Sequence, residues 1–323
     1  MAPNNLYAIL EDRSVIEDIR ELSRVDNCKS ACVIAQQWLV IAAAIAASVF
    51  IDRWYLYLAA IVVIAAKQHA LAVIVHDATH YRVFKSRFVN EYVGNLFCAF
   101  PIFISIQGYR GEHQLHHLWT NTREDPYLYM FDKDKAWQWP KTSGQALWQI
   151  LTDVTGLNIL RNLKLIRRWA PIGQWLMHNR NPQLNRRVTT DALYYLAFWA
   201  IILSILTLLG ALKMFLLLWM LPAFTFYVLF SRLRWISEHP YGSLTEIGFK
   251  IRHVESASLE RFFIAPLNVN YHIAHHLFPV VPLYNLPYAH HRLLQHSAYR
   301  EEADRYHSYL GATDSIRAEL IVN

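Results

Sequence analysis

Three short segments of this 323-residue chain carry closely spaced histidines that could bind metal ions. They read HDATH at 76–80, HQLHH at 113–117 and HIAHH at 272–276. The eight histidines are His76, His80, His113, His116, His117, His272, His275 and His276. On a helix, the spacing of three or four residues places the rings of each segment on one face.

Imidazole nitrogens are ligands for borderline metals such as iron, zinc and copper. Eight imidazoles are too many for one four-coordinate zinc, so they predict two metal ions. Iron is the usual choice where the task is oxygen chemistry. The alternative for any single segment is a group of interfacial or hydrogen-bonded histidines.

Four apolar segments are long enough to cross a membrane as helices. They are residues 33–51, 54–75, 192–209 and 213–231. The composition, 54% hydrophobic and 14% aromatic, excludes a disordered chain. A shorter apolar segment, 93–107, is interrupted by Pro101, so we expect it to be re-entrant or interfacial.

Four crossings place both chain ends and all three histidine segments on one side of the membrane. That side carries nearly all of the arginine and lysine, so the positive-inside rule predicts that it faces the cytosol. The same rule, together with anionic lipid, explains the net charge of +6 without nucleic acid. Residues 1–31 are expected to be a cytosolic amphipathic segment, with a surface helix over 6–24.

The three segments resemble the three histidine boxes of the integral-membrane fatty acid desaturase family. Flanking residues match as well: Asn90, Gly94, Thr120-Asn121, Asp125-Pro126, Leu277-Phe278-Pro279 and Tyr284-Asn285-Leu286-Pro287. The resemblance runs from about residue 54 to 295. It implies an all-α integral membrane protein with four transmembrane helices, a re-entrant or interfacial segment and a cytosolic helical cap that holds two irons. We expect residues 1–323 to form one such domain.

The resemblance also implies a ninth ligand between the fourth span and the third box. In the segment RLRWISEH at 232–239, the matching residue is His239. Some relatives hold a water on one iron with an asparagine at the position of Trp235. Asn268 and Asn270 are candidates to replace that asparagine, and a helix cap or turn is their alternative role.

Four carboxylates stand beside the expected ligands: Asp77, Glu112, Asp125 and Glu238. A carboxylate that accepts a hydrogen bond from a ligand imidazole orients the ring and raises its basicity, so each is a candidate for this role. Each could instead pair with an arginine.

The remaining histidines give weaker signals. His69 lies seven residues before His76, on the same helical face and about 10 Å deeper, so it could line a substrate tunnel. Packing in the protein interior with a hydrogen bond is its alternative role. His290, His291, His296 and His307 are expected at the surface or in the cap, and His253 gives no specific signal.

The resemblance implies an oxygen-dependent di-iron oxidoreductase that introduces a double bond into a fatty acyl chain of a membrane lipid or other acyl carrier. The sequence lacks an HPGG haem motif, so electrons are expected from an external ferredoxin or cytochrome b5 with its reductase. The alternative is a hydroxylase of the same family acting on a fatty acyl chain, carotenoid, alkane or sphingolipid. A haem bundle or a metal transporter would need its ligands within the membrane, whereas these histidines follow the ends of the spans.

Overall fold

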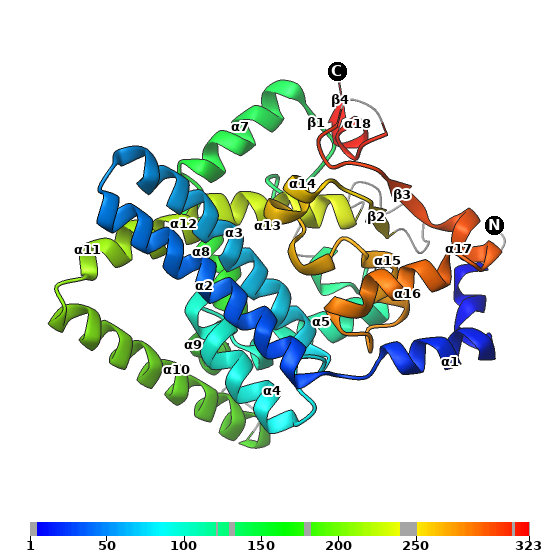
Figure 1. The fold of residues 1–323 in the computed structure, drawn as a ribbon, viewed down its shortest axis with the longest axis horizontal. Coiled ribbons are helices and arrows are strands. Elements are labelled where there is room, and N and C mark those ends of the chain that lie inside the picture. The colour runs from blue at the N-terminus through cyan, green and yellow to red at the C-terminus, as the bar shows by residue number, and fades with distance from the viewer. Residues whose placement is uncertain are drawn as a thin grey trace.

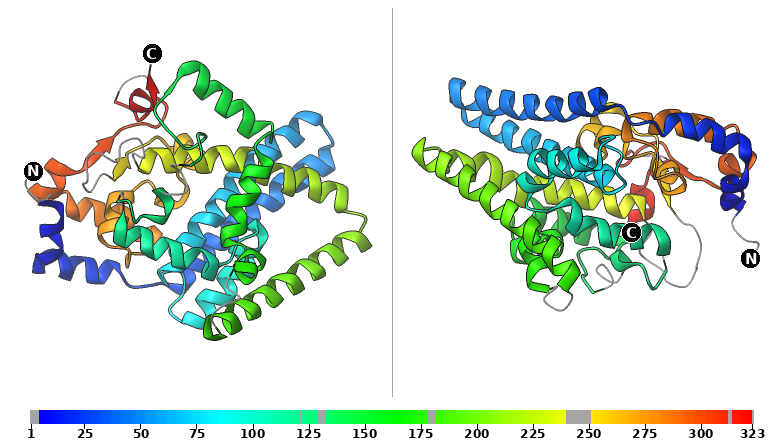
Figure 2. Two further views of the ribbon diagram at one scale, coloured as in Figure 1. Left: turned by 180° about the vertical axis from the view of Figure 1, so that it is seen from behind. Right: turned by 90° about the horizontal axis from the view of Figure 1, so that it is seen from below.

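The computed structural model describes residues 5–120, 122–128, 133–177, 182–239, 251–311 and 314–322. Asn121 therefore lies outside the described residues. In Figure 1 the long helices extend to one side, and the shorter helices and strands gather on the other side with both ends of the chain. Figure 2 shows the same division from behind and from below. We call the part with the shorter elements the cap.

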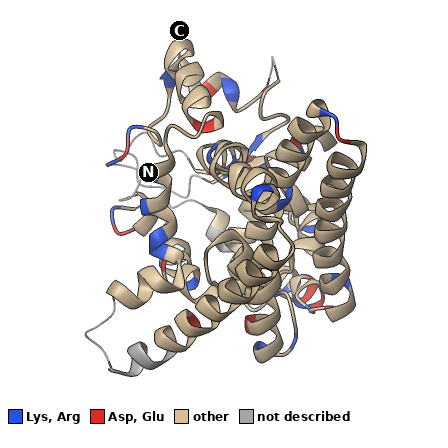
Figure 3. Cartoon of the chain, turned by 90° about the vertical axis from the view of Figure 1, so that its left-hand side faces the viewer, with Lys and Arg blue, Asp and Glu red and all other residues tan. Residues whose placement is uncertain are grey.

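Among the residues that the structure describes, four helical segments are long and apolar enough to cross a membrane, which confirms the predicted fold class. They are α2 (Asn27–Ile51), α3 (Trp54–Thr79), the Val188–Leu208 part of α10 (Pro182–Leu208), and Leu212–Glu238. Charged side chains are sparse along these helices (Figure 3). The α2 helix begins earlier than expected because the Asp26 carboxylate accepts hydrogen bonds from the backbone N–H groups of Cys28 and Lys29.

The fourth apolar segment is broken into four pieces. These are α11 (Leu212–Phe215), the π-helix η4 (Leu216–Met220), α12 (Leu221–Phe224) and α13 (Phe226–Glu238). Pro222 has no N–H group for a regular helical hydrogen bond, and Thr225 leaves helical geometry at φ −125° and ψ −98°. The buried Gln68 amide of α3 donates to the Trp219 carbonyl in the π-helical turn, 2.9 Å away.

The expected re-entrant segment, 93–107, contains a sharp bend. Helix α4 (Arg87–Gly94) continues through η2 (Asn95–Ala99) and η3 (Phe100–Ile102), and the chain then turns by 90° into α5 (Ile106–Trp119). At the turn Phe103 has a left-handed φ of 69°. The Asn95 side chain accepts a hydrogen bond from Ile106 N at 2.9 Å, which fixes the start of α5. The bend directs α5, and with it the second histidine box, into the cap.

The rest of the cap is built from short elements. Helices α7 (Ser143–Val154), α8 (Ile159–Trp169) and α9 (Pro171–Met177) precede α10. The later helices are α14 (Ser258–Phe263), η5 (Pro266–Asn268), α15 (His272–Leu277), η6 (Leu283–Asn285), α16 (Leu286–Leu293), α17 (Ser297–Glu302) and α18 (Arg317–Leu320). Two parallel strand pairs tie distant segments together: β1 (Lys141–Thr142) with β4 (Ile321–Val322), and β2 (Arg252–Val254) with β3 (Asp304–Tyr306).

The N-terminal segment packs onto the cap. The helix expected over 6–24 is divided at Asp12 into η1 (Asn5–Glu11) and α1 (Arg13–Leu22). Ile9 and Ile19 are buried in one hydrophobic cluster with Leu293 of α16. The apolar face of this amphipathic segment therefore packs against the cap, while its charged side chains are exposed.

Candidate metal centre

The first histidine box closes the second span. His76 lies in the last turn of α3, and His80 is its C-cap residue, where the chain leaves the helix. His76 is buried, and its ring centroid lies 5.7 Å from that of His80. The four-residue spacing therefore places both rings on one side of the helix end, as predicted.

The second box lies on α5, which begins where the Ser105 hydroxyl accepts a hydrogen bond from Gly108 N. His113, His116 and His117 all occur in its C-terminal half. Successive helical residues are about 100° apart, so His116 and His117 point to different neighbours.

The third box forms α15, and His239 follows α13 as its C-cap residue. His272, His275 and His239 are each buried. Helices from both halves of the chain therefore meet at one place in the cap.

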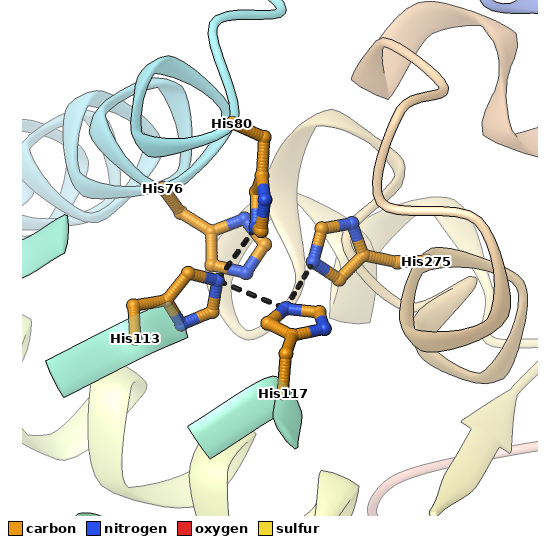
Figure 4. Close-up of side chains that lie close together, drawn as sticks. All are labelled: His76, His80, His113, His117 and His275. Carbon is orange, nitrogen blue, oxygen red and sulfur yellow. Dashed lines mark hydrogen bonds between the residues drawn. The ribbon is translucent and has the colours of Figure 1, made fainter. Parts of the chain in front are cut away.

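Five imidazoles form one cluster: His76, His80, His113, His117 and His275 (Figure 4). One ring nitrogen of each lies within 4.8 Å of those of the others. His113 Nε2 is 2.8 Å from His80 Nε2 and 3.0 Å from His117 Nε2. His117 Nε2 is in turn 3.1 Å from His275 Nε2. We call this group the five-histidine cluster.

The other four imidazoles fall into two overlapping groups that share His239, one with His116 and His276 and one with His272 and Glu238. We call these four histidines together the four-histidine cluster: His116, His239, His272 and His276. His272 Nε2 lies 2.8 Å from His239 Nε2 and 3.1 Å from His276 Nε2. The rings of His117 and His276, one from each cluster, stack with centroids 4.2 Å apart. The two clusters are thus adjacent, and His239 is brought together with residues of the second and third boxes.

These nitrogen positions fit bound metal ions. Two nitrogens bound to one ion at about 2.1 Å and at right angles to each other would be about 3 Å apart, close to the separations in both clusters. The Nε2 atom of His76 is buried within the five-histidine cluster and has no hydrogen-bond partner in the described residues. Buried polar atoms are normally paired, and a metal ion in the cluster would give this atom the partner it lacks.

The electrostatics favour the neutral form that metal binding requires. Burial lowers the pKa of His80 to about 3 because the charged imidazolium loses its hydration. Burial likewise lowers the pKa of His239 and His272 well below the usual value for histidine. Neutral imidazoles keep a lone pair that a metal ion can accept.

Two of the four candidate carboxylates contact the clusters. Asp125 is fully buried, and one of its oxygens lies 2.9 Å from His116 Nδ1 while the other accepts a hydrogen bond from Tyr127 N. Glu238 accepts a hydrogen bond from Arg234 Nε at 2.8 Å, and its second oxygen is 3.6 Å from His272 Nε2. The structure therefore places Asp125 and Glu238 where they can orient or supplement the four-histidine cluster.

The other carboxylates and the candidate asparagine make different contacts. Asp77 accepts a hydrogen bond from Leu283 N, and Glu112 accepts hydrogen bonds from Arg168 and Trp169 of α8. The Asn268 amide donates to the Leu283 carbonyl at 3.2 Å. Because their hydrogen bonds join helices and loops of the cap, none of the three is placed by these contacts to orient a clustered imidazole.

Sequence reasoning missed several side chains beside the clusters. The Tyr109 ring stacks on His113 with centroids 5.2 Å apart, and the Tyr127 hydroxyl lies 3.5 Å from His113 Nδ1. Arg234 is 5% exposed and pairs with Glu238. The spacing of four residues between Arg234 and Glu238 was a usable signal, because residues i and i+4 are neighbours on a helix.

An apolar pocket with a cavity volume of about 90 Å³ is bounded by Tyr109, whose ring stacks on His113 of the five-histidine cluster. Trp169, Trp235 and Ile102 form part of its wall. His69 also lines this pocket, and its Nδ1 atom lies 3.2 Å from the Phe263 carbonyl. Tyr109 therefore stands between the pocket and the five-histidine cluster.

Comparison with known proteins gives a consistent result. The family model described as "Fatty acid desaturase" matches residues 52–309. The dihydrorhizobitoxine desaturase of Bradyrhizobium elkanii is 29% identical over 300 residues, which cover 92% of this chain and 84% of that protein.

Two plant proteins are also similar. A chloroplastic omega-6 fatty acid desaturase of Brassica napus is 27% identical over 233 residues, 68% of this chain and 49% of that protein. A second, from Glycine max, is 26% identical over 256 residues, 73% of this chain and 56% of that protein. The chain thus spans about half the length of these plant relatives.

Proposed function

Since this chain belongs to the fatty acid desaturase family, we propose that its nine clustered histidines hold two non-haem iron ions and that it introduces a double bond into a fatty acyl chain. The chain is an oxidoreductase with a desaturase function, and the hydroxylase alternative is not favoured. The observation that carries the assignment of the site is the convergence of two adjacent imidazole clusters. Imidazole-rich sites suit iron among other borderline metals.

Within this proposal the side chains of the cap have separate roles. The five-histidine and four-histidine clusters each supply ligands to one ion. Asp125 accepts the Nδ1 proton of His116, which leaves Nε2 as the ligand atom and fixes the ring. Glu238, held by Arg234, is a further carboxylate beside the four-histidine cluster.

The pocket beside the five-histidine cluster is the proposed substrate site. Its aromatic wall, Tyr109, Trp169 and Trp235, excludes water from the reacting carbons. Bound iron supplies the activation of dioxygen for hydrogen removal from an unactivated CH₂–CH₂ unit. The overall reaction consumes one dioxygen, two protons and two electrons and removes two hydrogen atoms from the substrate. Its products are one double bond and two water molecules.

The electrons are proposed to come from a ferredoxin or cytochrome b5 with its reductase, because the overall reaction consumes two that the substrate does not supply. The clusters and both chain ends are proposed to face the cytosol. Supporting this placement, they lie at one end of the long helices, whose opposite ends are joined by short turns at Asp52-Arg53 and Gly210-Ala211 (Figure 1). Most lysine and arginine lie outside those short turns.

A more polar substrate is a second candidate, favoured by two side chains of the pocket. His69 Nε2 and Asn162 Nδ2 are buried without hydrogen-bond partners in the described residues, and both residues line the pocket. A hydrocarbon chain cannot satisfy these atoms, whereas a substrate that carries hydrogen-bonding groups can. The similarity to the enzyme named for dihydrorhizobitoxine makes such a substrate a concrete test compound.

The test compares cells that express the wild type, His116→Ala and the control His291→Ala, each supplied with a ferredoxin and its reductase. His291 is exposed on α16, outside both clusters. Mass spectrometry of lipid extracts should show an acyl species lighter by two hydrogens with the wild type and His291→Ala, and none with His116→Ala. A product heavier by one oxygen would contradict desaturation.

Unchanged acyl lipids, with conversion of dihydrorhizobitoxine, would instead favour the polar substrate. Asn162→Leu then separates the two candidates further. It should raise KM for a polar substrate and leave KM for an acyl chain unchanged or lower.

A further inference from the structure

Four side chains outside the nine clustered histidines form a second potential metal site in the cap. Three of them, His253, Glu255 and His290, have ligand atoms within 4.8 Å of one another. The fourth, the exposed His307, contacts Glu255, and its ring would move inwards to complete the ligand set. His253 lies on β2 and Glu255 directly follows it, while His290 is on α16 and His307 directly follows β3. We propose that they bind one divalent ion of the zinc type, with three imidazoles and one carboxylate as ligands.

The burial of His253 is the first argument. This residue is 0% exposed, and neither of its buried ring nitrogens makes a hydrogen bond of ordinary geometry in the described residues, although the Asn270 backbone lies close enough to act on the ring. A neutral imidazole in the protein interior normally satisfies at least one nitrogen. His290 is 6% exposed, and its ring stacks on His253 with centroids 4.3 Å apart. A bound ion would provide the missing partner for His253.

The distances are the second argument. Ligand atoms of His253, Glu255 and His290 all lie within 4.8 Å of one another. Glu255 Oε1 is 3.6 Å from His290 Nε2, and Glu255 Oε2 is 3.4 Å from His307 Nδ1. Four ligands at about 2.1 Å from a tetrahedral zinc would be about 3.4 Å apart, so the Glu255–His290 pair is close to an edge of that tetrahedron. The His307 pair is made by the other carboxylate oxygen and shows that His307 lies beside the site.

In two of these histidines, the ring nitrogen that would face away from the ion has a hydrogen-bond acceptor beside it, as metal-bound histidines usually do. His290 Nδ1 lies 2.8 Å from the buried Tyr299 hydroxyl, which can accept the Nδ1 proton and leave Nε2 free to bind the ion. His307 Nε2 lies 3.4 Å from the Asp314 carboxylate. A carboxylate behind a ligand histidine fixes its tautomer and raises its basicity.

The charge state of the proposed ligands also suits a divalent cation. Burial lowers the pKa of His253 to about 3 and that of His290 to about 4, so both rings are neutral at physiological pH. Glu255 brings the negative charge that a divalent cation needs. Arg305 is a positive group near both rings, and its guanidinium donates to the Arg300 carbonyl.

Such an ion would fasten separate parts of the cap. It would join the paired strands β2 and β3 to α16, whose sequence positions are distant. The His253 ring also contacts Tyr271, with centroids 4.9 Å apart, directly before the third histidine box. The site would therefore be structural and would stiffen the support of α15.

The test is the metal content of the full-length protein, purified in detergent from medium that contains iron and zinc. We expect one zinc per chain in the wild type, determined by mass spectrometry of the elements. His253→Ala and His290→Ala should lose this zinc and keep their iron. His291→Ala, the exposed neighbour on the same helix, should keep both.

Two further variants replace side chains that are partly exposed, so a loss of zinc in them would not result from misfolding. Glu255→Gln should lower zinc affinity, and Asp314→Asn should lower it about 10–100-fold. X-ray absorption at the zinc edge should show nitrogen and oxygen ligands in tetrahedral coordination in the wild type.

The result is separable from the proposed desaturase activity. His116→Ala should lose iron and activity but keep the zinc. If it loses the zinc instead, the ion occupied the histidine clusters and the proposal is overturned. A wild type without zinc, or full zinc retention in His253→Ala, His290→Ala and Glu255→Gln, would also overturn it.

Discussion

Asp125 is the side chain whose replacement tests the proposed metal centre most directly. It is 0% exposed and serves two partners: Oδ2 lies 2.9 Å from His116 Nδ1, and Oδ1 accepts a hydrogen bond from Tyr127 N at 2.9 Å. In Asp125→Asn one of the two oxygens becomes an NH₂ group. Since both partners present an N–H group when His116 binds metal through Nε2, one of the two hydrogen bonds must be lost.

The expected loss follows from this geometry. Removal of a carboxylate behind a ligand histidine typically costs about 10–100-fold in metal affinity or activity, which corresponds to about 1.4–2.7 kcal/mol. His116 belongs to the four-histidine cluster. The loss should therefore affect the ion in this cluster and spare the five-histidine cluster.

The assay is iron content during timed exposure to a chelator, together with the rate of product formation. The iron content of Asp125→Asn should fall towards one ion per chain while the wild type still holds two. Glu124→Gln removes an adjacent but exposed carboxylate and should behave as the wild type does. Two irons retained as tightly as in the wild type, with undiminished activity, would refute the assignment of Asp125 as the residue that orients a ligand.

Three further predictions concern packing, a buried ion pair and the metal. Gly108→Ala should lower stability by about 1–3 kcal/mol, since its new Cβ would lie 2.3 Å from the Trp169 carbonyl oxygen. Gly111→Ala places its Cβ in open space and should be neutral or stabilising. The thermal midpoints of unfolding of the two variants in detergent test this difference. Arg232→Met should destabilise the protein by about 3–5 kcal/mol because it leaves the buried Asp153 carboxylate unpaired, and adding Asp153→Leu should restore much of the loss in the same measurement. Removing the iron with a chelator should abolish desaturation, and activity should return on adding ferrous iron but not on adding magnesium.

The kind of protein and the main parts of its site could be predicted from the amino-acid sequence. Four apolar runs of spanning length require helices in lipid, because each backbone N–H and C=O group must be paired within its own segment. Histidines three or four residues apart share a helical face wherever that helix is placed. The membrane architecture and the three histidine boxes could therefore be predicted, and Asp125, chosen from the sequence, lies beside His116.

The division of the nine histidines between the two clusters depends on the packing of the helices. Box membership did not predict that His117 would join the first box while His116 joins His239, because this division depends on how α5 is rotated against α3, α13 and α15. Asp77 was chosen by proximity in sequence, yet its carboxylate accepts a hydrogen bond from a distant loop.

The same limit applies to burial in the cap. His290 was expected at the surface or in the cap, and His253 gave no specific signal. Strand pairing and the packing of α16 bring their two rings into contact, which neither expectation contained. Sequence spacing fixes contacts only within a helix or strand. Contacts between elements depend on bends, such as the 90° turn before α5, and on packing that arises from the whole chain.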